Sequence, residues 1–220
     1  MHIPDGFLDT KTWITTAVLS AGALGYSVKK SREELDEKQV PKLGIMAAFI
    51  FAAQMINFPI AGGTSGHLLG AALATVLLGP WNAALIISTV LVIQCFGFQD
   101  GGITALGGNI FNMAVVGVIV AFISCKILSS LFKNAAGRNI SIFIASWLSV
   151  FVAATMASFE LAVSGTVPFS VAFPAMAGWH TLIGIGEGLI TVVVVNTVTR
   201  MGFVDAKIAS VRGQRDERNL

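Results

Sequence analysis

Charged side chains are scarce in this sequence. Of its 220 residues, 12% are Asp, Glu, Lys or Arg and 55% are hydrophobic, whereas soluble domains carry about 25% charged residues. Between Leu43 and Gln99, His67 is the only side chain that can carry a charge near neutral pH. A helix needs about 20 apolar residues to cross the hydrocarbon core, so this stretch must fold back within the lipid bilayer. The composition excludes a soluble globular domain and indicates an integral membrane protein.

Basic clusters and paired cysteines are also absent. The net charge is +2 and the basic residues are dispersed over loops, which excludes a nucleic-acid partner. The two cysteines, Cys95 and Cys125, have no CxxC spacing and are expected to pack as small hydrophobic residues. The chain lacks the basic segment that opens a secretory signal and begins instead with Pro4, Asp5 and Asp9. Met1 is therefore expected to be the mature N-terminus.

Apolar runs separated by turn residues predict an all-α, polytopic membrane protein with about seven transmembrane helices. We expect three parts, an N-terminal segment (1–11), a helical bundle (12–199) and a cytoplasmic polar tail (200–220). A charged loop is expected at 31–42, and 99–112 is expected to be loop or re-entrant backbone buried in protein. Residues 165–178, which contain two prolines, should be irregular. The predicted spans are 12–28, 43–56, 67–78, 82–98, 113–131, 140–158 and 179–198.

The basic residues set the orientation of these spans. All Lys and Arg residues except Lys11 fall at or after the ends of the first, fifth and seventh spans. Because Lys and Arg stay on the cytoplasmic side, the N-terminus is predicted outside and the C-terminus inside. Met1, His2 and the glycine-rich turn before His67 then share the outer face.

Met1 and His2 can form a metal chelate at the start of the chain. The α-amine and the His2 amide nitrogen close a five-membered ring on a metal, and the amide and imidazole Nδ1 close a six-membered ring. Coplanar nitrogen donors suit Ni(II) or Cu(II), and Co(II) can be accepted, whereas Zn(II) prefers a tetrahedron and Mg(II) prefers oxygen. The planar arrangement slightly favours nickel over cobalt.

One in-plane position is left for an outside donor, and we assign it to His67. An ionisable residue within a membrane segment is by default a functional candidate. Taken singly, His2 also fits a disordered terminal residue, and His67 a buried histidine with its hydrogen bonds satisfied. His180 is a rival ligand that shares a helical face with Glu187. It also fits an interfacial histidine beside Trp179.

The segment Gly63-Thr64-Ser65-Gly66 allows a second interpretation. It fits the GxSG of a rhomboid-like intramembrane serine protease with Ser65 as nucleophile and His180 as base, although GxSG alone is a weak pattern. The segment lacks the Lys-Ser/Thr of a phosphate-binding loop, so the chain is not expected to hydrolyse ATP itself. An autonomous secondary metal carrier usually shows internal repeats, and only Glu160 and Glu187 are candidate coupling residues for one.

Small residues recur every four positions in the first two predicted spans, a spacing that permits close contact between helices. Packing within the bundle explains at least one of these stripes, and the other is a candidate docking face for a membrane partner. The stripes are Ala17, Ala21 and Gly25, and Gly44, Ala48 and Ala52.

Four motifs, MHIPDGFL, GGTSGHLLG, GFQDGGITALGGNIFNM and HTLIGIGEGLIT, together resemble the cobalt/nickel-specific substrate-binding (S) component of energy-coupling factor transporters, the CbiM/NikM family. The resemblance covers nearly the whole chain and implies that Met1, His2 and His67 are metal ligands. It also implies that the N-terminal segment tucks into the bundle, and that the docking stripe is Gly44, Ala48 and Ala52. Ser65, Asn109, Asn112 and His180 are expected to line or brace the pocket.

The resemblance implies a transporter subunit of the cell membrane and not an enzyme. Ni(II) or Co(II) would be its transported substrate, with no covalent cofactor, for supply to cobalamin biosynthesis or nickel enzymes. Its expected partners are a membrane coupling (T) component, cytoplasmic ATPase (A) components and a small additional membrane subunit.

Overall fold

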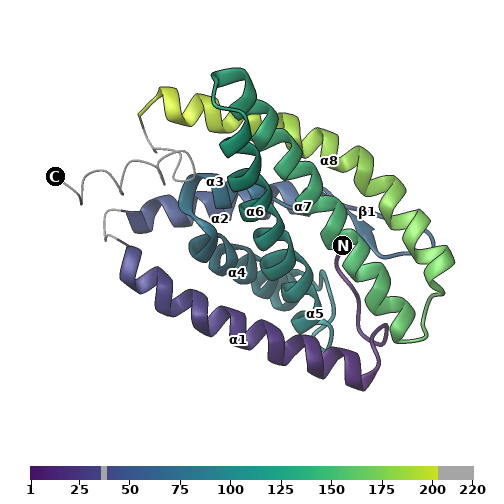
Figure 1. The fold of residues 1–220 in the computed structure, drawn as a ribbon. Helices are drawn as coiled ribbons and strands as arrows, with labels where there is room; N and C mark the ends of the chain where they lie inside the picture. The colour runs from purple at the N-terminus through teal and green to yellow at the C-terminus, as the bar shows by residue number, and fades with distance from the viewer. Residues whose placement is uncertain (36–38, 203–220) are drawn as a thin grey trace.

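The computed structural model describes residues 1–35 and 39–202, which are almost entirely helical (Figure 1). Segments α5, η2 and α6 run without interruption from Leu106 to Leu131, so the described residues form seven helices, and the predicted fold class is confirmed. The elements are α1 (Thr10–Glu34), α2 (Val40–Met55), β1 (Phe58–Pro59), β2 (Ser65–Gly66), α3 (Ala71–Leu78), α4 (Pro80–Phe98), α5 (Leu106–Ile110), the π-helical η2 (Phe111–Val116), α6 (Gly117–Leu131), α7 (Ala135–Val163) and α8 (Phe169–Arg200).

Four of these helices are long and apolar enough to cross a membrane, namely α4, the continuous helix 106–131, α7 and α8. Helix α2 is a shorter apolar helix. The N-terminal segment and the α7–α8 connection lie at one end of the molecule, and the ends of α1 and α8 lie toward the other (Figure 1). Lys29, Lys30 and Arg200 lie at that second end, as the predicted orientation requires. The predicted tail beyond Gly202 lies outside the described residues.

Helix α1 turns a polar face inward and an apolar face outward. It begins after Asp9, whose side chain accepts a hydrogen bond from the Thr12 amide at 3.0 Å and so caps the first turn. The Ser20 hydroxyl donates to the Gly107 carbonyl at 2.8 Å, and Ser31 donates to the Asn82 side chain at 2.6 Å. This pattern suits a helix that faces lipid, because apolar residues cover its outer side while hydroxyls bond to the bundle.

The segment that enters α3 positions His67. The span was predicted to begin at His67, but α3 begins at Ala71 and residues 67–70 have no regular secondary structure. Gly70 has φ +78° and a Cβ there would lie 2.8 Å from Ile50, so glycine is needed at this bend. The short β1 and β2 pair antiparallel just before it.

Several predicted boundaries were wrong. Helix α1 continues through the charged residues to Glu34, six residues beyond its predicted end at 28. Residues 169–178 belong to α8 although Pro174 lies inside it. Membrane helices tolerate an internal proline because neighbouring groups satisfy the freed carbonyl. The stretch 99–112 is loop only to Ala105, and α5 starts at Leu106.

Candidate metal centre

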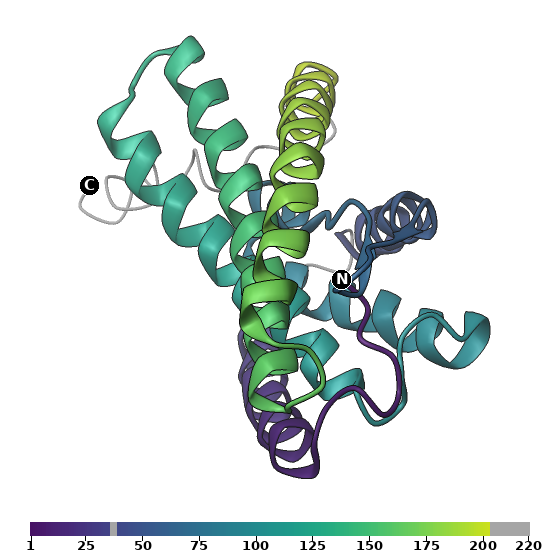
Figure 2. The same cartoon turned by 90° about the vertical axis from the view of Figure 1, so that its right-hand side faces the viewer.

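The N-terminal segment, residues 1–9, is threaded into the bundle without regular secondary structure (Figure 2). The Ile3 amide donates to Asn109 Oδ1 at 2.8 Å, and its carbonyl accepts from Asn109 Nδ2 at 3.1 Å and from the Gly102 amide at 2.9 Å. A Cβ at Gly102 would lie 2.3 Å from the Asp5 amide nitrogen, so only glycine permits this approach. These contacts place Met1 in the core, with its side chain fully buried.

Hydrogen bonds at Asp5 and Phe7 anchor the outer part of this segment. Asp5 Oδ1 accepts from the Thr104 amide at 2.7 Å and from the Thr104 hydroxyl at 2.6 Å. These bonds stabilise the charged carboxylate and lower the pKa of Asp5. The Thr166 hydroxyl donates to the Phe7 carbonyl at 2.9 Å. The segment is therefore tied both to the 99–105 loop and to the α7–α8 connection.

Ser65 gathers two of the predicted donor nitrogens. The Met1 amine donates to Ser65 Oγ at 2.8 Å and also to the Ser65 carbonyl. The His2 amide donates to the same Oγ at 3.0 Å. The amine and the amide thus converge on one point, as they must in the predicted chelate.

The His2 ring is held in one tautomer. Its Nε2 lies 3.1 Å from Gln94 Oε1, an acceptor, so Nε2 carries the proton. Nδ1 is then the basic nitrogen, and it lies 3.2 Å from Asp100 Oδ1 without forming a hydrogen bond. A basic nitrogen and a carboxylate oxygen so close together are two acceptors that a cation would satisfy. Nδ1 is the ring atom that the predicted chelate requires.

His67 is prepared in a similar way. Its Nδ1 lies 2.8 Å from the Leu68 carbonyl, so Nδ1 carries the proton and Nε2 is the basic nitrogen. That Nε2 is buried and has no hydrogen-bond partner among the described residues. The His2 and His67 rings stack with their centroids 4.5 Å apart and their planes at 23°. The structure therefore brings Met1, His2 and His67 together.

Burial favours the neutral form of these nitrogens. It lowers the pKa of the Met1 amine well below its usual value, although the nearby Asp100 carboxylate acts in the opposite direction. Burial is also the main cause that lowers the pKa of His2 to about 3 and that of His67 well below its usual range. Partial burial raises the pKa of Asp100. Neutral nitrogens with free lone pairs are the form that binds a metal.

No group of three or more His, Cys, Asp or Glu side chains is gathered as a metal site within residues 1–35 and 39–202. The predicted donors differ in kind, because two of the four are the terminal amine and a main-chain amide. A cluster of ligating side chains is therefore not what this hypothesis requires.

The other residues predicted to line or brace the pocket do not all contact the N-terminal segment. Asn109 braces Ile3 directly, as described above. Asn112 donates instead to Glu160 Oε2 at 2.7 Å, so its recorded side-chain bond is to α7 and not to the N-terminal segment. His180 is fully buried, with Nδ1 2.7 Å from the Met176 carbonyl and Nε2 without a partner in the described part of the chain. Its role stays a prediction.

The protease interpretation finds no support in this geometry. Ser65 Oγ is engaged by Met1 and His2, and no hydrogen bond joins it to His180 within the described ranges. A nucleophile and its base need hydrogen-bond contact.

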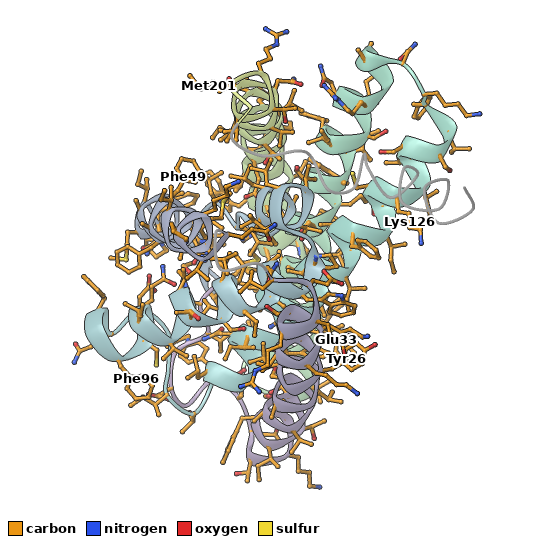
Figure 3. All side chains as sticks on the ribbon, turned by 90° about the vertical axis from the view of Figure 1, so that its left-hand side faces the viewer. Tyr26, Glu33, Phe49, Phe96, Lys126 and Met201 are labelled. Carbon is orange, nitrogen blue, oxygen red and sulfur yellow. The ribbon has the colours of Figure 1, made fainter. Side chains whose placement is uncertain are left out.

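The predicted docking stripe lies on the outer face of α2. Gly44, Ala48 and Ala52 are all exposed, and a Cβ at Gly44 would meet no atom within 4 Å. Phe49, on the same helix, also lies outward (Figure 3). By contrast, a Cβ at Gly107 would lie 2.5 Å from the Cα of Ala17, so the first stripe includes an internal packing contact.

Sequence reasoning missed the residues that orient the donors. Gln94 and Gln54 are fully buried polar side chains within apolar helices. Buried polar groups in membrane helices are expensive unless bonded, which is the signal that could have singled them out. Both predicted buried cysteines, Cys95 and Cys125, are free and buried, as expected.

Residues 2–203 match the protein family described as CbiM, cobalt uptake substrate-specific transmembrane region. The putative fused nickel transport protein NikMN of Archaeoglobus fulgidus is 44% identical over 213 residues, which are 95% of this chain and 70% of that protein. The cobalt transport protein CbiM of Acetohalobium arabaticum is 30% identical over 233 residues, and the match covers 96% of this chain and 86% of that protein. A crystal structure described as a truncated transition metal transporter superposes with a TM-score of 0.86 at 35% identity, covering 91% of this chain and 99% of that one.

Proposed function

The chain belongs to the CbiM family of cobalt uptake substrate-specific transmembrane regions, and we propose that it captures Ni(II) or Co(II) at its outer face for uptake across the cell membrane. The four donors are the Met1 amine, the His2 amide nitrogen, His2 Nδ1 and His67 Nε2. Family membership and the names of its relatives make the chain a transporter subunit and not a protease.

The observation that carries the proposal is the state of His67. Its Nε2 is a buried acceptor without a partner among the described residues, on a ring stacked against His2. Buried polar atoms are normally bonded. A metal held by the first two residues would satisfy this atom and complete a planar set of nitrogens, which suits nickel and accepts cobalt.

Closing the chelate requires a local rearrangement. The amine and the amide donate to Ser65 Oγ in the metal-free arrangement, while His2 Nδ1 faces Asp100. Binding through the amide nitrogen would require its proton to pass to solvent, and the Ser65 bond to that nitrogen would then break. Asp100 then supplies negative charge beside the bound cation.

We propose that uptake is driven by ATP hydrolysed by partner subunits. The chain would be the substrate-specific component of an energy-coupling factor transporter, with a membrane coupling component and cytoplasmic ATPases. The relative named as a fused transport protein is longer than this chain, which supports a further small membrane subunit acting with it. Delivery to cobalamin biosynthesis or to nickel enzymes would follow uptake.

Titration calorimetry of the purified protein with Ni(II) and with Co(II) tests the capture step. The native N-terminus should give tight binding of one ion per chain. Three variants, one extra residue before Met1, His2→Ala and His67→Ala, should each lose tight binding. Unchanged binding in all three would refute the proposed site. Uptake of radioactive nickel by cells with and without the ATPase components tests the energy source.

A further inference from the structure

The segment that carries His67 has its own anchors, which the metal site does not use directly. We call residues 67–70 the His67 strap. It connects β2 to α3 without regular secondary structure, so most of its peptide groups are not bonded within a helix or a sheet. Such groups must be satisfied by other means when they lie inside a membrane protein. Two buried side chains from different helices supply the bonds.

Glu187, in the middle of α8, holds the strap from one side. Its Oε2 accepts from the Leu69 amide and its Oε1 accepts from the Gly70 amide at 2.8 Å. The residue is only 3% exposed. A carboxylate that accepts two amide hydrogens at the start of a helix is a strong, charge-assisted arrangement. Glu187 therefore fixes the strap and the first turn of α3 to α8.

Gln54, on α2, holds the strap from the other side. Its Nε2 donates to the Leu69 carbonyl at 2.7 Å, and the side chain is fully buried. Ile50, one turn earlier, fills the space that a Cβ at Gly70 would need. Both main-chain groups of Leu69 are thus bonded to side chains, one from α8 and one from α2, which stand apart in Figure 2.

We propose that Glu187 and Gln54 are positioning residues that clamp the His67 strap so that His67 Nε2 faces the donors of Met1 and His2. This inference rests on the proposed function of His67 as a ligand. His67 is two residues from Leu69, and its own ring is bonded to the Leu68 carbonyl within the strap. A shift of the strap would therefore carry the His67 ring with it.

The clamp also connects the metal site to the outer face of α2. Gln54 lies on the side of α2 that faces the strap, while Gly44, Ala48 and Ala52 are exposed. A partner that displaces α2 pulls on the Leu69 carbonyl, whereas Glu187 retains the Leu69 amide. Movement of α2 would then change the position of His67 without direct contact between partner and metal.

A double-mutant comparison separates positioning from general stabilisation. Nickel affinity is measured by calorimetry for the full chain, its native N-terminus intact, in wild type, Glu187→Gln, Gln54→Leu and His67→Ala, and in each clamp variant combined with His67→Ala. Removing a group that orients a metal ligand typically lowers metal affinity about 10- to 100-fold. We expect that loss for both clamp variants alone, and no further loss when His67 is already absent.

The control is Glu160→Gln, which alters another buried carboxylate that bonds to Asn112 and not to the strap. It should leave nickel affinity unchanged. The absorption spectrum of nickel-loaded Glu187→Gln should shift toward that of His67→Ala, because the fourth nitrogen is misplaced. If Glu187→Gln does not yield monodisperse protein, Gln54→Leu decides the question.

The inference is overturned if the clamp variants bind nickel like wild type, or if they lower affinity equally in the His67→Ala background. Failure of the proposed function gives a different result, since His67→Ala would then bind nickel as tightly as wild type.

Discussion

The N-terminal segment and helix α2 are both short, yet they are held in opposite ways. The segment has no regular secondary structure. Hydrogen bonds at Ile3, Asp5 and Phe7 hold it to α5, to the 99–105 loop and to the α7–α8 connection. Helix α2 satisfies its own backbone. Gln54 donates a hydrogen bond to the Leu69 carbonyl and Ile50 packs against Gly70, while the small residues of α2 face outward. The difference separates two tasks. We propose that the fixed geometry of the segment serves metal capture and that the exposed face of α2 receives the partner.

The strongest way to break this comparison is to extend the N-terminus by one glycine. The amine would become an amide and the added residue would have to enter a fully buried position. We expect nickel affinity to fall on the order of 1000-fold, about 4 kcal/mol, in titration calorimetry. The same residue added after Leu220 is the control and should have no effect. Equal affinities for the two extended proteins would show that the amine is not a donor.

The next largest effect is expected for His67→Ala. It removes one of four nitrogens but leaves the chelate of Met1 and His2, so we expect a loss of about 100-fold, near 2.7 kcal/mol. His180→Ala should have a smaller effect, below about 10-fold, because among the ring contacts of the described residues it is His67 and not His180 that stacks on His2. The reverse order in calorimetry would make His180 the ligand.

Asn109→Ala sharpens the comparison at the segment itself. It removes both side-chain bonds to Ile3, leaving a buried amide without its acceptor. We expect about 2 kcal/mol lower stability and about 10-fold weaker nickel binding, measured by thermal unfolding and calorimetry. Asn82→Ala is a matched control, since Asn82 is also buried but bonds to Ser31 and Leu78. It should lower stability without changing nickel affinity.

Ala48→Leu on α2 is expected to leave nickel binding unchanged. The added atoms point away from the bundle, so the metal site is untouched. Cellular nickel uptake should nevertheless fall at least about 10-fold, because close helix contact requires small residues. Val193→Leu places the same side chain at an exposed position of α8 and should leave uptake normal. Normal uptake in Ala48→Leu would remove α2 as the docking face.

The membrane class could be predicted, and the donor residues could be proposed, because both depend on local sequence. Scarce charge marks the spans, and adjacency alone lets Met1 and His2 form two chelate rings. His67 is conspicuous because it is the only ionisable side chain in a long apolar stretch.

The residues that orient those donors could not be predicted in this way. Gln94 meets His2 across 92 positions of sequence, and Glu187 meets Leu69 across 118. Nothing local indicates such pairs, since each depends on how the helices pack. The hydrogen bond from Asn112 to Glu160 also depends on helix packing. The motif alone does not indicate it, although Asn112 was predicted to line or brace the pocket. Proline gave a misleading local signal at 174, because helix packing overrides its preference for a break.

The burial of Met1 has a consequence for biosynthesis. Residues 1–9 are made before the rest of the bundle, but their hydrogen-bond partners Ser65, Asn109 and Thr166 are made much later. Glu187, which holds the His67 strap, lies in the middle of α8, the last helix in the described residues. This early segment is thus among the last parts of the chain to reach its final place. A chain that stops before α8 would lack the complete site, so nickel binding also reports that the whole bundle has assembled.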